Sequence, residues 1–300
     1  MKKKTYLFAL MAMVLTLGSC SDNENGIGGE TSKYITVSTS IGNMTRVATD
    51  AKGGQTFEEG DEISVYAWTG DATIAPDASE RVVNNAINKL TNGSWVSTPQ
   101  MLWKNNRDKH YFIGVYPTAA ISDLSAGEYT FDANKQTESD LLVAVNKDGL
   151  SYNADAQQTV PLTFTHVMAK LAVNLTYKNQ WGGIPTVEKV VVGNAAKEAT
   201  INYLTKVVTP STTAKEDFSL PEITENTKYV SVIIPQEDVT QLTIVIGGKN
   251  FVYDNGTPFK LESGKITTVN LEVGRDEIKL GDVKITNWED GSTFSGEALN

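Results

Sequence analysis

Apolar and polar side chains alternate with a period of two residues in most segments after residue 33. In residues 34–41 (YITVSTSI) the alternation places Ile35, Val37 and Ile41 on one face and mainly hydroxyl side chains on the other. The other strand-like segments are rich in β-branched and aromatic residues, and Gly, Asn, Asp and Pro separate them. They cover residues 62–68, 110–116, 140–145, 161–177, 188–193, 199–204, 228–235, 242–248, 250–254, 266–273 and 277–288. Many short strands with turns between them predict an all-β chain of antiparallel β-sandwiches.

Residues 77–92 are the best candidate for a helix. Val82, Ala86, Ile87 and Leu90 lie near helical spacing in this segment. An exposed loop that is partly strand fits the same residues equally well, so the sequence leaves both alternatives open.

A polar stretch, residues 146–160, separates two groups of strands and is rich in Gly and Asn. Such stretches are typical of domain boundaries. The sequence therefore predicts an N-terminal β-sandwich over residues 34–158 and a C-terminal β-sandwich over residues 159–300.

The first 20 residues have the order of a secretory signal. Lysines at positions 2–4 precede an almost wholly apolar stretch, residues 6–17, which is short for a membrane span. The sequence LGSC at 17–20 resembles a bacterial lipobox, in which a peptidase cuts before the cysteine and the thiol carries a diacylglycerol. This resemblance assigns residues 1–19 to a lipoprotein signal peptide and Cys20 to lipidation.

Cys20 is the only cysteine of the chain, so it forms no internal disulfide. Residues 20–33 are rich in Gly, Ser and acidic residues and predict a flexible tether. An acidic run after the lipidated cysteine resembles the surface-export signal of some Gram-negative lipoproteins. We therefore expect an outer-membrane, lipid-anchored precursor displayed at the cell surface. The alternative is an ordinary cleaved signal with an incidental cysteine.

The charge of the chain excludes one class of partner. The sequence contains 26 Lys and Arg against 36 Asp and Glu, and removal of the three signal-peptide lysines makes the mature chain still more acidic. An acidic surface repels nucleic acid and anionic lipid headgroups. We therefore expect no nucleic-acid partner.

No motif predicts a catalytic, metal or cofactor site. His110 and His166 both lie within strand-like apolar runs, and we interpret them as structural residues. The sequence has no paired Cys or His spacing typical of zinc sites and no nucleophile elbow. We therefore expect no enzyme activity, no catalytic residues, no metal and no cofactor.

Two other function classes stay open at this point. A surface lipoprotein that binds glycans would use exposed aromatic side chains, which the chain offers as Trp68, Trp95, Trp103, Trp181 and Trp288. A β-sandwich hydrolase would need two carboxyl groups about 5–10 Å apart in a cleft. The sequence singles out no such pair.

Several short segments carry a resemblance to a known family. They are FEEGDEISVYAW (57–68), a Trp followed by HYFIGVYP (103–117), LTFTHVMAKLAV (162–173), SGKITTVNL (263–271) and VKITNWEDG (283–291). In this order and behind a lipobox, they resemble the fimbrillin family, the lipoprotein pilin precursors of type V pili. The resemblance implies two tandem transthyretin-like β-sandwich domains and a structural subunit of a cell-surface fimbria (pilus) that functions in cell adhesion.

The same resemblance implies maturation by a protease. A trypsin-like enzyme would cut after an arginine near the N-terminus and so remove the first strand. Here that bond is Arg46–Val47, in a polar stretch just after the strand of Ile35, Val37 and Ile41. An ordinary solvated arginine is the alternative for Arg46.

The vacated groove would then accept a donor strand from the next subunit. GDVKITNW (281–288) is a plausible donor, because Val283 and Ile285 share one face and Lys284 and Thr286 share the other. It is equally plausible as the last strand of its own domain. The expected partners are other fimbrial subunits, the maturation protease, the outer membrane through the lipid, and host or bacterial surface ligands. A non-polymerising anchor or tip adhesin is the alternative role within the family.

Overall fold

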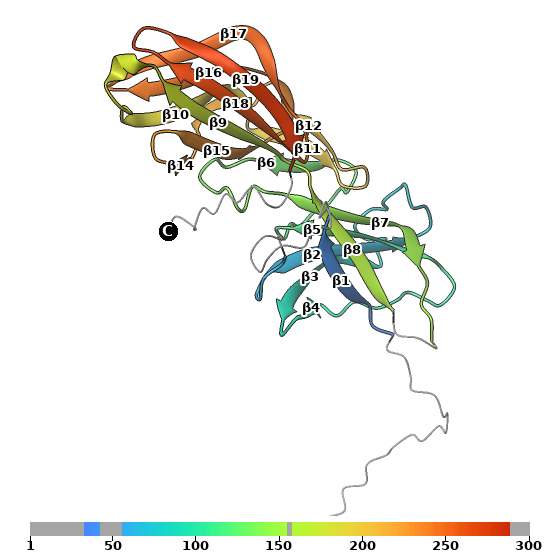
Figure 1. The fold of residues 1–300 in the computed structure, drawn as a ribbon. Coiled ribbons are helices and arrows are strands. Elements are labelled where there is room, and N and C mark those ends of the chain that lie inside the picture. Colours follow the sequence, from blue (N-terminus) through green and yellow to red (C-terminus); the bar gives the residue numbers. More distant parts are fainter. Residues whose placement is uncertain (1–32, 43–55, 155–157, 289–300) are drawn as a thin grey trace, which may run out of the picture. The chain divides into compact units, whose positions relative to one another are not determined.

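The computed structural model describes residues 33–42, 56–154 and 158–288 (Figure 1). These residues form β-strands and one short 3₁₀ helix, η1 (Asn179–Trp181). Residues 31–300 cluster into one compact unit. In the described part of the chain, no helix is long and apolar enough to cross a membrane. The predicted all-β fold is confirmed.

The N-terminal half forms one seven-stranded sheet in the order β1-β8-β7-β5-β2-β3-β4. Its strands are β1 (Thr36–Ile41), β2 (Glu62–Thr69), β3 (Val83–Thr91), β4 (Ser94–Thr98), β5 (His110–Tyr116), β7 (Leu142–Leu150) and β8 (Thr159–His166). Neighbouring strands are antiparallel except β1 and β8, which run parallel. Strands β1 and β4 are therefore the two edges of this sheet.

The remaining strands form three smaller sheets. The five-stranded sheet has the order β14 (Glu222–Thr224), β15 (Lys228–Ile233), β9 (Ala169–Tyr177), β18 (Lys265–Val273), β19 (Ile278–Asn287). The four-stranded sheet has the order β13 (Lys215–Ser219), β10 (Val187–Ala196), β16 (Gln236–Ile246), β17 (Lys249–Leu261). The three-stranded sheet has the order β12 (Val207–Pro210), β11 (Glu198–Asn202), β6 (Gly127–Thr130). Strands β9 and β18 are parallel, and the other pairs are antiparallel.

Two apolar cores cover opposite faces of the seven-stranded sheet. Ile63, Val65 and Phe112 face the first core, together with residues of β1, β7 and β8. Tyr66 and Ile113 point the other way, into a second core that continues through the strands of the C-terminal half. Because both faces are covered, residues 63–68 are all buried, in place of a clean alternation of buried and exposed positions.

The segment for which a helix was one alternative is strand β3. Asn85 has a positive φ of 58°, and the four residues of β3 from Val83 to Ala86 lie opposite only three residues of β2, Val65 to Ala67. This β-bulge inserts one extra residue between buried positions. The resulting spacing of three imitates the spacing of a helix.

The sheets change later in the chain than the boundary predicted between residues 158 and 159. Strand β8 pairs with β7 and β1, so it belongs to the seven-stranded sheet. The five-stranded sheet begins with β9 at Ala169. The division into sandwich domains over residues 34–158 and 159–300 stays a prediction.

Candidate functional site

Strand β1 has a buried apolar face although it lies at a sheet edge. Ile35, Val37 and Ile41 are 2%, 6% and 8% exposed, and all three pack into the first core. Leu162 and Phe164 of β8 belong to the same core. Full burial of an aliphatic side chain contributes about 1.5–3 kcal/mol. The side chains of β1 therefore contribute substantially to the stability of this core.

A single backbone ladder holds β1 in the sheet. The register with β8 runs from Thr36 opposite Thr159 to Ile41 opposite Phe164. Just before β1, the amide of Ile35 donates to the carbonyl of Met101 at 2.9 Å. The opposite edge of β1 forms no ladder with another described strand of the sheet. Removal of β1 would thus expose the backbone edge of β8 as well as the apolar positions beneath it.

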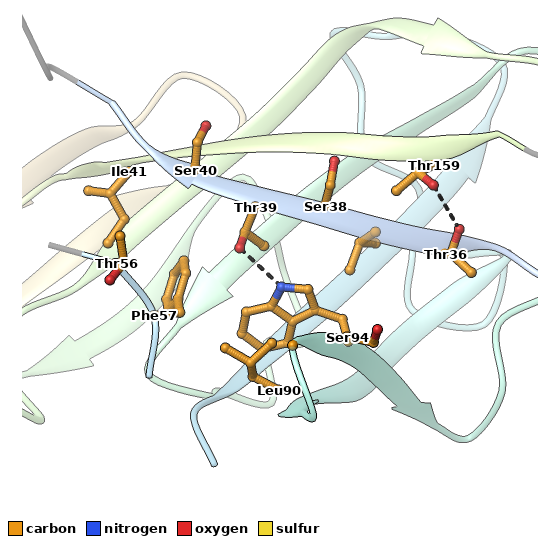
Figure 2. A pocket seen from close by; sticks show the side chains of 13 residues that line it. Thr36, Ser38, Thr39, Ser40, Ile41, Thr56, Phe57, Leu90, Ser94 and Thr159 are labelled. Atoms are coloured by element: carbon orange, nitrogen blue, oxygen red, sulfur yellow. Dashed lines mark hydrogen bonds between the residues drawn. The ribbon is translucent and has the colours of Figure 1, made fainter. Parts of the chain in front are cut away.

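The hydroxyl side chains of β1 make three contacts with other side chains. Thr36 lies 3.3 Å from Thr159 and Ser40 lies 3.2 Å from Thr163, measured between side-chain oxygens. Figure 2 shows the third contact, in which the indole Nε1 of Trp95 donates to the Thr39 hydroxyl at 3.0 Å. A neutral hydrogen bond of this kind contributes about 0.5–1.5 kcal/mol net. These contacts add to the backbone ladder that holds β1 in register.

A groove of about 620 Å³ runs along the free edge of β1 (Figure 2). Its walls are β1, residues 56–57 and the end of the β3–β4 hairpin with Leu90, Gly93 and Trp95. The bond between Trp95 and Thr39 brings the two edges of the seven-stranded sheet together. The sheet therefore curves around the first core, and the groove lies between its edges.

Phe57 closes one part of this groove. Its ring makes edge-to-face contacts with Trp95, Tyr116 and Phe164 at centroid distances of 5.3, 5.4 and 5.1 Å. Such pairs favour a fixed ring position. These contacts thus anchor residues 56–57 beside the end of β1.

Strand β19 is an edge strand of a different kind, because its apolar side chains are partly exposed. Val283 and Ile285 are 41% and 36% exposed. They lie opposite Val269 and Thr267 of β18, on one face, with Lys284 on the other. In this chain β19 pairs with β18 as the last strand of the five-stranded sheet (Figure 1).

A β-bulge extends the apolar face of β19. Leu280 lies opposite Leu271 and Val283 lies opposite Val269, so four residues of β19 (280–283) lie opposite three residues of β18 (269–271). The extra residue keeps side chains on one face that strict alternation would divide. Because directly opposed residues share a face, the apolar stripe comprises Ile278, Leu280, Val283 and Ile285.

The model of the fimbrillin-like family matches residues 45–288 of this chain. The chain belongs to the fimbrillin-like family. A protein of Bacteroides uniformis named as a candidate fimbrium subunit, Fim1C, is 24% identical, with 97% of each chain covered.

Solved structures share the fold of this fimbrillin-like chain. A candidate cell adhesion protein of Bacteroides uniformis has a TM-score of 0.62 at 20% identity, with 86% of this chain and 100% of that chain covered. A fimbrial protein of Bacteroides vulgatus has a TM-score of 0.54 at 12% identity, with 86% and 100% covered. At these identities the structures support the fold alone.

The predicted lipidation site, Cys20, and the predicted cleavage bond, Arg46–Val47, lie outside the described residues. Another arginine of the fimbrillin-like chain, Arg81, is buried, and its guanidinium donates to the carbonyls of Ile121 and Ser122 at 2.8 and 2.6 Å. Burial lowers the pKa of Arg81. A side chain held in this way is not accessible to a trypsin-like protease.

Both histidines have structural partners, as the sequence predicted. His110 is fully buried; its Nδ1 donates to the carbonyl of Asp108 at 3.1 Å, and its Nε2 accepts the amide of Lys104 at 3.0 Å. Desolvation lowers the pKa of His110, which favours this neutral, doubly bonded ring. His166 Nδ1 lies 2.8 Å from the Asp140 carboxylate.

The tryptophans of the fimbrillin-like chain have packing roles, and its candidate metal ligands form no metal-binding cluster in the described residues. In the described ranges, no group of three or more His, Cys, Asp or Glu side chains could hold a metal ion. Trp68, Trp103 and Trp288 are buried, and Trp95 and Trp181 are half-buried and hydrogen-bonded. A glycan platform needs coplanar exposed rings, and none of the five indoles is exposed.

Proposed function

We propose that this chain is a structural subunit of a cell-surface fimbria and that it assembles by strand exchange. The observation that carries the proposal is the contrast between the two edge strands. The apolar face of β1 is buried in the first core, whereas the apolar stripe of β19 is half exposed. Strand β1 would leave the groove that it fills, and β19 of another copy would place its apolar side chains in that groove.

Cleavage after Arg46 would release β1 as the acceptor side of this exchange. The strand would then be held by one ladder and three buried side chains, with no covalent link to the rest of the domain. Its departure would expose the edge of β8 and the first core. An extended segment with the same alternation can pair with such an edge by β-augmentation.

Strand β19 of another copy would supply the donor side. Val283 and Ile285 match the period-two spacing that Ile35 and Val37 use in the groove. Their transfer from a half-exposed position to the core would bury apolar surface and so favour the assembled state. We propose no catalytic role for either strand.

Export as a lipoprotein would bring the subunit to the cell surface, with the outer membrane bound through acyl chains on Cys20. More than one acyl chain is needed for a stable anchor, and a diacylglycerol provides two. Cys20→Ala is expected to abolish the incorporation of a radioactive or alkynyl palmitate probe. Equal labelling of the variant and the wild type would contradict the lipidation proposal.

The experiment that tests the proposed function uses the chain from Ser21 onwards. Brief trypsin treatment is expected to give one early cut, after Arg46, followed by a ladder of multimers on a gel loaded without boiling. Mass spectrometry identifies the new N-terminus, which should be Val47. A first cut at another site, or a complete cut at Arg46 with monomer only, would contradict the proposal.

A further inference from the structure

Trp288 is held on both faces of its indole ring. The imidazole of His166 stacks on it with a centroid distance of 3.9 Å and an interplanar angle of 8°. The ammonium of Lys170 lies over the same ring, 4.0 Å from the centroid. An imidazole in parallel contact leaves no room for an ammonium on its side, so the two groups contact opposite faces. We call this arrangement of His166, Trp288 and Lys170 the Trp288 clasp.

The clasp joins two of the segments that the sequence singled out. His166 and Lys170 come from LTFTHVMAKLAV, and Trp288 comes from VKITNWEDG. The Asp140 carboxylate fixes the imidazole at 2.8 Å, and the amide of Trp288 donates to the carbonyl of Gly264 at 3.0 Å. The ring is only 4% exposed.

Trp288 is the main side-chain anchor of β19. From residue 278 to residue 288 it is the one buried residue, because the others are exposed or half-buried. The bulge after Leu280 interrupts the ladder with β18, and edge ladders open readily. Loss of the clasp would leave β19 held by backbone hydrogen bonds and a few partly buried side chains.

The clasp also touches the strand that holds β1. His166 is the last residue of β8, and Phe164, two residues earlier, lies opposite Ile41 of β1. Strand β8 therefore pairs with β1 at Phe164 and, two residues later, contributes His166 to the clasp that holds β19. The end of β8 thus contacts Ile41 of β1 through Phe164 and Trp288 through His166.

We propose that the Trp288 clasp retains β19 on its own subunit and that opening of the clasp precedes donation of this strand to another copy. This inference rests on the proposed function for the donation step, whereas the retention step stands on the contacts of the free subunit. Aromatic stacking and a desolvated cation–π contact both stabilise the closed state. The clasp thus keeps the apolar stripe of β19 away from other copies until an acceptor groove is open.

Hydrogen–deuterium exchange of the uncut chain tests the retention step without any assembly. In Trp288→Ala, the amides of residues 278–287 are expected to exchange about 10- to 100-fold faster than in wild type, with β9 and β15 unchanged. Lys170→Met should give a smaller increase, and His166→Phe, which keeps a stacked ring, should stay within about threefold of wild type. Val96→Ala, on the exposed surface of β4, is the control and should change nothing in β19.

To test the donation step, we would measure the rate at which multimers form after the cut at Arg46. Trp288→Ala should form multimers at least about tenfold faster than wild type if clasp opening limits the reaction. Unchanged exchange in β19 would overturn the retention step, and faster exchange without faster multimer formation would overturn the order of steps. If cut wild type forms no multimers at all, the proposed function fails, while the exchange data still decide whether the clasp retains β19. If Trp288→Ala also speeds amide exchange in β9, the milder variant Trp288→Phe is used in its place. We expect it too to speed amide exchange in β19 and multimer formation.

Discussion

Arg46→Ala is expected to leave the chain as a folded monomer under conditions in which the wild type forms multimers. While the chain is intact, β1 is tethered to the groove at an effective concentration in the millimolar range, so a donor from another copy competes poorly. Ile35, Val37 and Ile41 contribute about 1.5–3 kcal/mol each to its retention. Unboiled gels after brief trypsin treatment measure the outcome.

The matched control for this variant is Arg107→Ala. Arg107 is an exposed arginine, in a turn where Asn105 Oδ1 accepts the amides of Arg107 and Asp108 at 2.9 and 2.8 Å. We expect this variant to form the same ladder as wild type, because the turn is not connected to β1. Multimers from Arg46→Ala as abundant as those from wild type would rule out this maturation step.

The second large effect is expected from Val283→Ser combined with Ile285→Ser. Both side chains are substantially exposed in the free subunit, so the free energy of unfolding should change by no more than about 1 kcal/mol. In the assembled state the same side chains would occupy the first core, where a buried hydroxyl without a partner is costly. The cut variant should therefore remain monomeric on an unboiled gel.

An equivalent pair of exposed apolar residues serves as the control. Val252 is 47% exposed and Ile184 is 65% exposed, and neither lies on β19. Val252→Ser combined with Ile184→Ser should unfold at nearly the same urea concentration as the donor variant and still form multimers. If the donor variant forms multimers at the wild-type rate, another segment of the chain is the donor.

The sequence predicts those features that depend on local pattern. The alternation in residues 34–41 predicts which side chains of β1 are buried, and the structure confirms Ile35, Val37 and Ile41 as core residues. The same reasoning pairs Val283 with Ile285 on one face, as the register with β18 now shows. Each of these predictions requires only that neighbouring residues in a strand point to opposite sides.

Features that depend on long-range pairing were not predictable in this way. Strand β8 lies between β7 and β1 in the first sheet, and β1 lies over a hundred residues earlier in the chain. The bulges at Asn85 and after Leu280 shift the alternation by one residue. The first gives β3 an apolar spacing that resembles a helix, and the second makes one apolar face of β19 look like two in the sequence. The Trp288 clasp requires three side chains from β8, β9 and the end of β19.

In the proposed strand exchange, β1 must leave its groove before subunits join, and a reversible lock on β1 tests this step. Ser40 and Thr163 are in register, with their hydroxyl oxygens 3.2 Å apart on the solvent face. The chain from Ser21 onwards contains no cysteine, so Ser40→Cys combined with Thr163→Cys introduces a single disulfide between β1 and β8.

The measurement is the multimer ladder of this doubly substituted chain after the cut at Arg46, with and without reductant. We expect complete cleavage but monomer only while the disulfide is closed, and a wild-type ladder once dithiothreitol opens it. Wild type should give the same ladder in both conditions. A ladder of equal strength from the oxidised, cut variant would show that subunits join with β1 still in place, and would contradict the account.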